Sequence, residues 1–221
     1  MKDIVIFGCG GVGSYVAHAI NEINRNSQQW NILGFLDDDK KLKNVKINGY
    51  PVIGTSEWLR EKPGITIALA IADPRVKKEL VDKFYEYGCD QFATIIHPHT
   101  WIADSVTIGE GSIIYPGTTI NVNSIIGKFA MVNMNCAIGH DVEIKDFAFL
   151  APNVGVGGNS LLSTGCSVGI GASVIQHVTI GAWATIGAGA VVIREVNQEE
   201  VVVGNPAKPL KYKDSGENFN Q

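Results

Sequence analysis

A period of six residues runs through the second half of this 221-residue chain. Every sixth residue from Ile102 to Val192 is aliphatic, at all sixteen positions. The residue four places after each, from Val106 to Ala190, is small or β-branched at all fifteen positions. A fixed period of this length constrains the fold more strongly than local propensity does, and it is typical of a solenoid built from short repeats.

The six-residue period predicts a three-sided coil. Each hexapeptide forms one flat side with its aliphatic residue pointing inward, and the small residue allows the chain to turn the corner. Three hexapeptides close one coil, so residues 18 apart stack at about the 4.8 Å spacing of paired strands, and the segment makes about five coils. A β-sandwich would instead need two-residue alternation and a turn after each short strand.

The first part of the chain alternates apolar runs with helical stretches. We expect two helices, over residues 11–24 and 74–87. We expect four strands, over residues 4–8, 31–38, 65–72 and 91–97. Strands separated by helices predict a parallel, doubly wound sheet that binds ligands at the carboxyl ends of its strands. The chain is therefore expected to hold a Rossmann-like α/β domain over residues 1–97 and a parallel β-helix over residues 98–221.

Charge and cysteine content exclude several classes of protein. The net charge is −4, from 18 basic and 22 acidic residues, and no block of Lys or Arg offers a surface for nucleic acid. The four cysteines show no CxxC spacing, which indicates buried thiols in a reducing compartment. The chain opens as a strand rather than a signal peptide, and no apolar run reaches about 18 residues. We expect a cytoplasmic protein without membrane insertion.

A glycine-rich loop stands between the first expected strand and the first helix. Gly8, Gly10 and Gly13 fit the pattern GxGxxG, which directs backbone N–H groups and a helix N-terminus at phosphates. Asp37 and Asp38, at the end of the second strand, could accept hydrogen bonds from a ribose or a base. The loop alone would suggest NAD, but a sheet of about four strands is too small for a full dinucleotide domain.

His140 is the candidate catalytic residue of the coils. It follows Ile138 and Gly139, which puts it at an outward-facing corner, and Asp141 comes next. A neutral imidazole can take a proton from an attacking amine, and an adjacent carboxylate can orient the ring. On the residues alone, a polar corner side chain explains His140 equally well.

A zinc site is the alternative use of histidines in such a solenoid. The solenoid carbonic anhydrases need three histidines that meet between subunits, two of them five residues apart on one coil. The coils here hold His140 and His177 without such a pair. We therefore expect no metal, and we interpret His177 as a solvated corner residue.

Several segments together resemble a known enzyme family. They are IVIFGCGG, FLDD, IHP, NCAIGHDVEIKDF and VVVGNPAK. They resemble nucleotide-sugar N-acetyltransferases that act on 4-amino-4,6-dideoxy sugars in glycan biosynthesis, with the sialic acid O-acetyltransferases as near relatives. The resemblance implies a left-handed β-helix, acetyl-CoA as co-substrate, and a homotrimer whose active sites lie between subunits. It also implies that His140 is the general base and Asp141 its partner.

The resemblance also assigns binding residues. The nucleotide sugar is expected at Gly10, Gly11, Asp37, Asp38, Ala72, Asp73 and Asn133. Acetyl-CoA is expected at Gly158, Ile170, Ala188 and Lys208, with the Gly158 N–H as the oxyanion donor. This sequence departs from the family at Phe149 and Val12, where relatives commonly carry histidine, so a cofactor or substrate contact is expected to differ there.

The function predicted from the sequence is transfer of acetyl from acetyl-CoA to the 4-amino group of a nucleotide sugar, with UDP as the preferred nucleotide. An O-acetyltransferase for a sialic acid would use the same base and the same cofactor groove. A third interpretation is a nucleotide-binding solenoid without catalysis. Retention of His140, Asp141 and the GNPAK segment disfavours that third interpretation.

Overall fold

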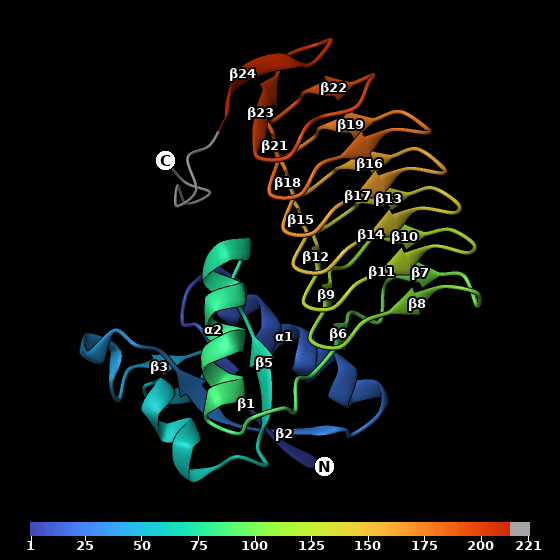
Figure 1. Cartoon of the computed structure of the whole chain (residues 1–221). Coiled ribbons are helices and arrows are strands. Elements are labelled where there is room, and N and C mark those ends of the chain that lie inside the picture. Colours follow the sequence, from blue (N-terminus) through green and yellow to red (C-terminus); the bar gives the residue numbers. More distant parts are fainter. Residues whose placement is uncertain (213–221) are drawn as a thin grey trace. The chain divides into compact units, whose positions relative to one another are not determined.

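The computed structural model describes residues 1–212 (Figure 1). The chain divides into two compact units. The first holds residues 1–72 and 76–98, and the second holds residues 73–75 and the chain from residue 99 onward.

The first unit is an α/β domain around a small parallel sheet with the strand order β3-β4-β2-β1-β5, in which only β3 is antiparallel to its neighbour. The strands of this sheet are β1 (Lys2–Phe7), β2 (Trp30–Leu36), β3 (Lys46–Ile47), β4 (Tyr50–Gly54) and β5 (Thr66–Leu69), and the short strand β6 (Ile95–Ile96) lies outside it. Its helices are α1 (Gly11–Asn26), the 3₁₀ segments η1 (Lys40–Leu42) and η2 (Ser56–Glu61), and α2 (Pro74–Glu86). The inner faces of β1 and α1 are fully buried and form the core of this unit.

Three of the four strands expected in this unit are present, and one expectation was wrong. Residues 91–97 contribute only the two-residue β6 and a bridge between Phe92 and Ile67. Sequence analysis also missed β4, which pairs with β2. Pro51 has no N–H and argues against a strand, but β4 pairs with β2 at Val52 and Gly54 and leaves Pro51 out of that ladder.

The second unit is a left-handed parallel β-helix, as the six-residue period predicts. Its sixteen two-residue strands are β7 (Trp101–Ile102), β8 (Thr107–Ile108), β9 (Ile113–Ile114), β10 (Thr119–Ile120), β11 (Ile125–Ile126), β12 (Met131–Val132), β13 (Ala137–Ile138), β14 (Glu143–Ile144), β15 (Phe149–Leu150), β16 (Gly155–Val156), β17 (Leu161–Leu162), β18 (Ser167–Val168), β19 (Ser173–Val174), β20 (Thr179–Ile180), β21 (Thr185–Ile186) and β22 (Val191–Val192). They stack into three sheets, and each strand pairs in parallel with its counterpart one coil later, as β10 does with β13. The strand β23 (Glu200–Val203) continues one sheet, and β24 (Lys208–Tyr212) pairs with it in antiparallel fashion.

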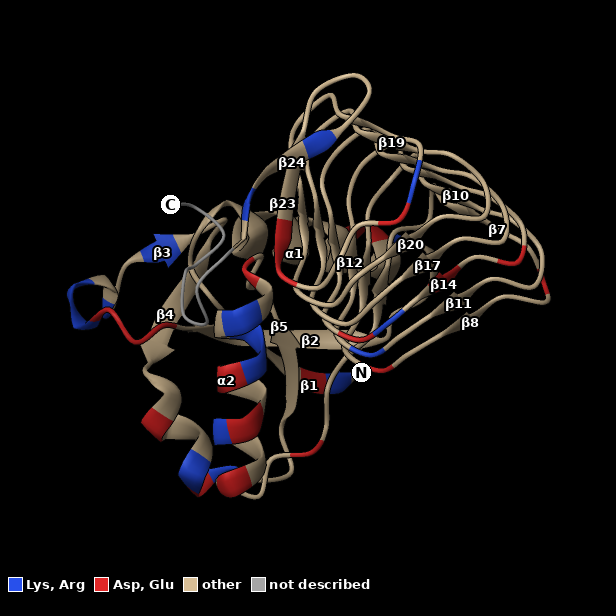
Figure 2. Cartoon of the chain, turned by 45° about the horizontal axis from the view of Figure 1, so that its top comes forward, with Lys and Arg blue, Asp and Glu red and all other residues tan. Residues whose placement is uncertain are grey.

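The interior of the β-helix is the aliphatic series. Its fourteen members from Ile114 to Val192 are at most 4% exposed, whereas Ile102 and Ile108 in the first coil are half-buried. Most charged residues of these coils lie in the turns rather than in the strands (Figure 2). Burial of the aliphatic stripe is the main stabilising contribution to this unit.

The corners of the coils require a special backbone conformation. From Gly111 to Gly189, every sixth residue has a φ between 55° and 73°. This left-handed region is inexpensive for glycine and tolerable for asparagine, which are the commonest residues at these positions. Small side chains inside the corners complete the turn, and Ser124 is one of them, with its hydroxyl donating to the carbonyl of Gly139 over 2.8 Å.

Candidate active site

His140 lies on an exposed corner between β13 and β14. Its Nδ1 lies 2.7 Å from Asp141 Oδ2, and 54% of the His140 side chain and 44% of the Asp141 side chain are exposed. The hydrogen bond from His140, and after it one from Asn123, holds the pKa of Asp141 below its usual range. Because an ionised carboxylate only accepts hydrogen bonds, the tautomer of the neutral ring that fits this contact has its proton on Nδ1 and its lone pair on Nε2.

The free ring nitrogen faces the next coil. A Cβ built on Gly158 would lie 2.7 Å from His140 Nε2 and 2.8 Å from its Cε1, so the imidazole ring packs against Gly158 and only glycine fits beneath it. In residues 1–212, the Gly158 N–H donates to no backbone carbonyl, while its carbonyl accepts from the His177 N–H at 3.0 Å. A ring nitrogen that can accept a proton therefore lies next to a backbone N–H that has no backbone acceptor, and acyl transfer uses groups of these two kinds.

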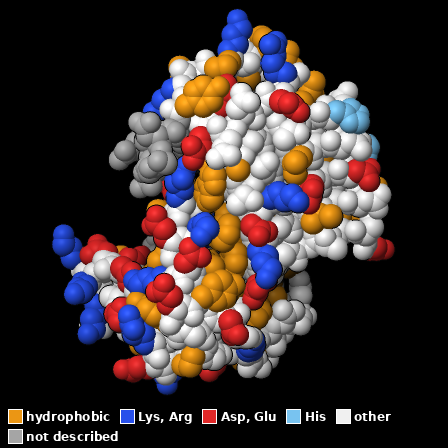
Figure 3. Space-filling view, in the orientation of Figure 1, with side chains coloured by type: hydrophobic (Ala, Val, Ile, Leu, Met, Phe, Trp, Pro, Cys, Tyr) orange, Lys and Arg blue, Asp and Glu red, His pale blue; other side chains and the backbone are white. Residues whose placement is uncertain are grey.

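The backbone on both sides of His140 is pinned from the coil below. The buried Ser124 hydroxyl donates to the Gly139 carbonyl at 2.8 Å and accepts from the Val142 N–H at 3.1 Å. The Asp141 N–H donates to the Val122 carbonyl at 2.9 Å. These contacts fix the four-residue corner, so the imidazole is held on a rigid backbone although its ring is exposed. The space-filling view shows histidine side chains at the surface (Figure 3).

The structure separates the residues predicted for acetyl-CoA into groups. Gly158 stacks directly on His140, one coil later. Ile170 and Ala188, both exposed, stack on each other at a different corner of the same prism. Lys208 is exposed on β24. A single chain therefore brings Gly158 next to His140, but it keeps Ile170 and Ala188 away from that pair.

Asn133 and Phe149 lie on the sheet that contains β12 and β15. Asn133 Oδ1 accepts from the Met134 N–H at 2.9 Å, and its carbonyl accepts from Thr118 Oγ1 at 2.8 Å. Phe149 is only 7% exposed, on a strand that pairs with Met131 and Ser167. At this position, where the family resemblance led us to expect histidine, the chain has a buried aromatic ring.

The glycine-rich loop of the first unit is shaped for close approach. A Cβ on Gly13 would lie 1.9 Å from the Gly8 carbonyl oxygen, so helix α1 can pack here only with glycine. Gly10 and Gly11 face open space, and Gly10 caps α1 without a side-chain hydrogen bond. The first N–H groups of α1 are therefore accessible, as a phosphate site requires.

Asp37 ties this loop to β2. Its Oδ2 accepts from the Cys9 N–H and its Oδ1 from the Asp39 N–H, each at 2.9 Å. Burial, with the nearby Asp37 carboxylate, raises the pKa of the Cys9 thiol to about 12, so the thiolate nucleophile is suppressed. The loop therefore offers binding groups rather than a covalent catalyst.

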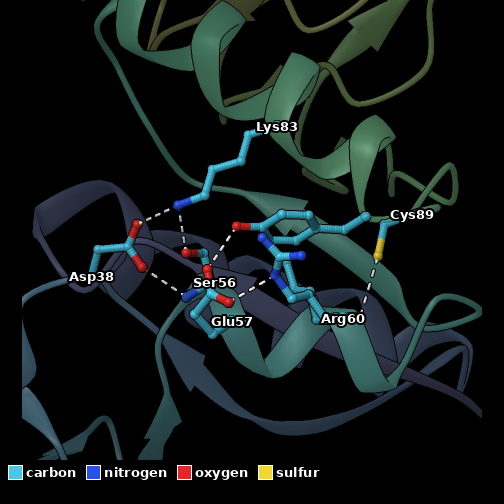
Figure 4. A network of polar contacts seen from close by, with 8 residues as sticks. Asp38, Ser56, Glu57, Arg60, Lys83 and Cys89 are labelled. Atoms are coloured by element: carbon cyan, nitrogen blue, oxygen red, sulfur yellow. Dashed lines mark hydrogen bonds and ion pairs between the residues drawn. The ribbon is translucent and has the colours of Figure 1, made fainter.

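Asp38 has its partners within the protein (Figure 4). Its Oδ1 accepts from the Ser56 N–H at 2.7 Å and its Oδ2 from Lys83 Nζ at 3.2 Å, while Lys83 also donates to Ser56 Oγ at 2.7 Å. Burial alone would raise the pKa of Asp38, but the hydrogen bonds from Ser56 and Lys83 outweigh it and lower that pKa. This carboxylate anchors η2 and α2 to the end of β2.

A cavity of about 330 Å³ opens beside Asp37 within the first unit. Its lining residues are Asp37, Asp39, Lys40, Lys43, Val52, Ile53, Gly54, Thr55 and Trp58. The volume suits a small organic ring, and the lining combines apolar walls with two lysines and two carboxylates. Sequence analysis named only Asp37 among these residues, because β4, which supplies three of them, was missed.

Ala72 and Asp73 complete the residues predicted for the sugar. Asp73 Oδ1 accepts from the Arg75 N–H at 2.9 Å, at the start of α2, and Ala72 is half-buried before it. In residues 1–212, no group of three or more His, Cys, Asp or Glu side chains is arranged to hold a metal ion. Within the same part of the chain, no helix combines the length and the apolar character that crossing a membrane demands.

Comparison with known proteins shows the family. Residues 3–84 match the family described as PglD N-terminal domain. WeeI from Acinetobacter baumannii AYE is 32% identical, with a TM-score of 0.84 over 95% of this chain and 100% of that chain. The chain belongs to the PglD-like family of nucleotide-sugar N-acetyltransferases.

Two further relatives of this PglD-like chain carry informative names. PerB from Caulobacter crescentus, solved with CoA and GDP-perosamine, is 30% identical with a TM-score of 0.86 over 96% of this chain and 98% of that chain. The UDP-N-acetylbacillosamine N-acetyltransferase of Bacillus subtilis is 32% identical over 116 residues, which are 52% of this chain and 51% of that protein. The chain thus spans about half the length of this curated relative.

Proposed function

We propose that this chain transfers an acetyl group from acetyl-CoA to the 4-amino group of a nucleotide-linked 4-amino-4,6-dideoxy sugar. The observation that carries the proposal is the His140–Asp141 pair, whose free Nε2 faces the Gly158 backbone on an exposed corner. The family supports the reaction class, and PerB was solved with CoA and GDP-perosamine together.

The chemistry is direct attack. The sugar amine nitrogen bonds to the thioester carbonyl carbon while His140 Nε2 takes a proton from that nitrogen. The carbonyl oxygen becomes an oxyanion, for which the Gly158 N–H is the donor. The carbon–sulfur bond then breaks, and the proton held by His140 passes to the CoA sulfur. A base placed in this way contributes about 10² to 10⁴ in rate.

The two units have separate tasks in this proposal. The domain of residues 1–97 binds the nucleotide through the glycine-rich loop and the cavity beside Asp37, and the domain of residues 98–221 binds acetyl-CoA. The last nine residues of the second domain lie outside the described part of the chain. Uracil is the proposed base, in line with the name of the Bacillus subtilis relative. Binding of UDP, dTDP and GDP, measured by thermal shift, tests this choice.

The active protein is proposed to be a homotrimer in the cytoplasm. Ile170 and Ala188 lie at a different corner from His140, so in this proposal one prism supplies the base and its neighbour supplies these two cofactor contacts. Analytical ultracentrifugation tests the trimer. A mixed trimer of His140→Ala and Ile170→Glu chains tests shared sites, because some of its interfaces regain an intact pair of contributions.

The decisive test replaces the base. We expect His140→Ala to lower kcat by about a hundredfold or more, with nucleotide affinity and oligomeric state unchanged. His177→Ala, two coils away on an exposed corner, is the matched control and should keep the wild-type rate. A near-normal rate in His140→Ala would refute the assignment. Acceptors with a hydroxyl in place of the amine distinguish N-acetylation from O-acetylation.

A further inference from the structure

The Asp141 carboxylate has a second partner on the coil below. Asn123 Nδ2 donates to Asp141 Oδ1 over 3.1 Å, while Asp141 Oδ2 lies 2.7 Å from His140 Nδ1. Asn123 precedes Asp141 by one turn of the coil, and both residues have positive φ, 59° and 55°. Amide, carboxylate and imidazole thus form a hydrogen-bonded chain across two coils.

The backbone of Asn123 departs from the pattern of the repeat. The corner residues from Phe129 to Gly189 each donate their N–H to a backbone carbonyl of the coil below, as Asp141 does to Val122. The Asn123 N–H donates instead to Ser105 Oγ, at 2.9 Å. The residue that contacts Asp141 is therefore held by a side chain specific to this position.

We infer that Asn123 is a positioning residue for the His140–Asp141 pair, an inference that rests on the proposed function. An exposed carboxylate can rotate about the bond that joins it to Cβ, because that torsion is broad. A hydrogen bond from Asn123 to Oδ1 restrains that rotation and leaves Oδ2 directed at Nδ1. The proton then stays on Nδ1, and the lone pair of Nε2 stays directed at the space beside Gly158.

The charges around His140 make this arrangement sensitive to the residue at position 123. The coil below presents Val122 and Asn123 to this corner, and the coil above presents Gly158 and Asn159, none of which is charged. In residues 1–212, Asp141 is the charged group in contact with the ring. A carboxylate at position 123 would add a second negative charge and favour the imidazolium, which cannot accept a proton.

The test combines two substitutions with a matched control. We expect Asn123→Ala to lower kcat about fivefold with the KM for acetyl-CoA unchanged, because one hydrogen bond to a charged group is lost. We expect Asn123→Asp to move the acid limb of the pH profile of kcat upward by about half a unit or more. Asn135→Ala, at an exposed position with φ 57° on another corner, should change neither.

A double-mutant cycle decides whether Asn123 acts through Asp141. In an Asp141→Asn background, Asn123→Ala should cause no further loss of kcat. An equal loss in both backgrounds, or a kcat for Asn123→Ala within about twofold of the Asn135→Ala control, would overturn the inference.

One readout does not depend on activity. If Asn123 binds the carboxylate, Asn123→Ala raises the pKa of Asp141 in an NMR titration, and an unchanged titration overturns the inference. Full activity in His140→Ala would instead remove the proposed function and leave this titration to be judged separately.

Discussion

Two corners of the β-helix share one backbone conformation but differ in the chemistry and the burial of their side chains. The corner that carries His140 presents Asn123, Asp141, Asn159 and His177, all exposed. The other corner presents Phe129, Phe147 and Trp183 at equivalent positions. There Phe129 is 2% exposed, and its ring stacks on that of Phe147 at 5.2 Å with an angle of 12°.

The difference shows how a repeat separates stability from chemistry. Bulky residues are disfavoured in the left-handed region, so stacking and burial must offset their cost at the aromatic corner. At the polar corner, side chains are solvated, and their hydrogen bonds orient one another instead of filling space. At each corner a ring packs against a glycine of the neighbouring coil, Trp183 against Gly165 and His140 against Gly158. Substituting these two glycines therefore compares the effect of the same change at the two corners.

The largest effect is expected at the aromatic corner. A Cβ on Gly165 would lie 2.2 Å from the Trp183 ring, and its φ is 66°. We expect Gly165→Ala to lower the free energy of unfolding by about 3 to 4 kcal/mol, from overpacking and backbone strain together. Gly171→Ala, with the same φ and open space around it, should cost about 1 kcal/mol. Urea unfolding of both variants measures the difference, and equal losses would show that backbone strain alone matters.

At the polar corner, we expect the glycine to matter for activity instead. Gly158→Ala should lower kcat about a hundredfold, because its methyl group would occupy the space beside His140 Nε2. The exposed imidazole can rotate away, so the free energy of unfolding should change by less than about 1 kcal/mol. Steady-state kinetics and urea unfolding of one preparation give both numbers. A stable variant with full activity would contradict the site as described.

The smallest effect is on the pH dependence of stability. The pKa of Asp141 is lowered in the folded chain, so its contribution is present above the unfolded value near 4 and is lost as pH falls through the folded value. Asp141→Asn should therefore flatten the acid side of the curve of Tm against pH. The change should be small because the carboxylate is exposed. Thermal unfolding between about pH 3 and 6 measures it, and an identical slope in both proteins would argue against the pairing.

The sequence was sufficient to predict the β-helix and not sufficient for the first sheet. The aliphatic series must face inward, and three sides of equal length stack each residue on its counterpart one coil later, so one pattern specifies all three sheets. In the first unit, each strand depends on a partner distant in sequence. Pro51 argues against a strand, so β4 was not predicted. The cavity beside Asp37, which β4 and Trp58 help to line, was therefore not predicted either.

The candidate site was partly predictable because residues one coil apart in the repeat lie next to each other. His140 and Gly158 are one coil apart in sequence, so the repeat alone predicts that they are neighbours. Asn123 stands one coil before Asp141 and could have been found by the same arithmetic, but the repeat does not predict that its side-chain amide donates to Asp141 or that Ser105 accepts from its backbone N–H. For Asp38 the sequence pattern was less informative. A carboxylate at the end of a strand suggested a contact with a ligand, and the sequence did not show that Ser56 and Lys83 donate hydrogen bonds to it.

The unbroken ladder of the coils limits how the length of this chain can change. One residue inserted within a side would turn every later aliphatic side chain from the interior toward water and shift Gly158 away from His140. A whole turn added near the carboxyl end would leave the corner that carries His140 unchanged and only lengthen the column. Insertions and deletions that the β-helix tolerates should therefore be multiples of one 18-residue coil, or loops that project from a corner.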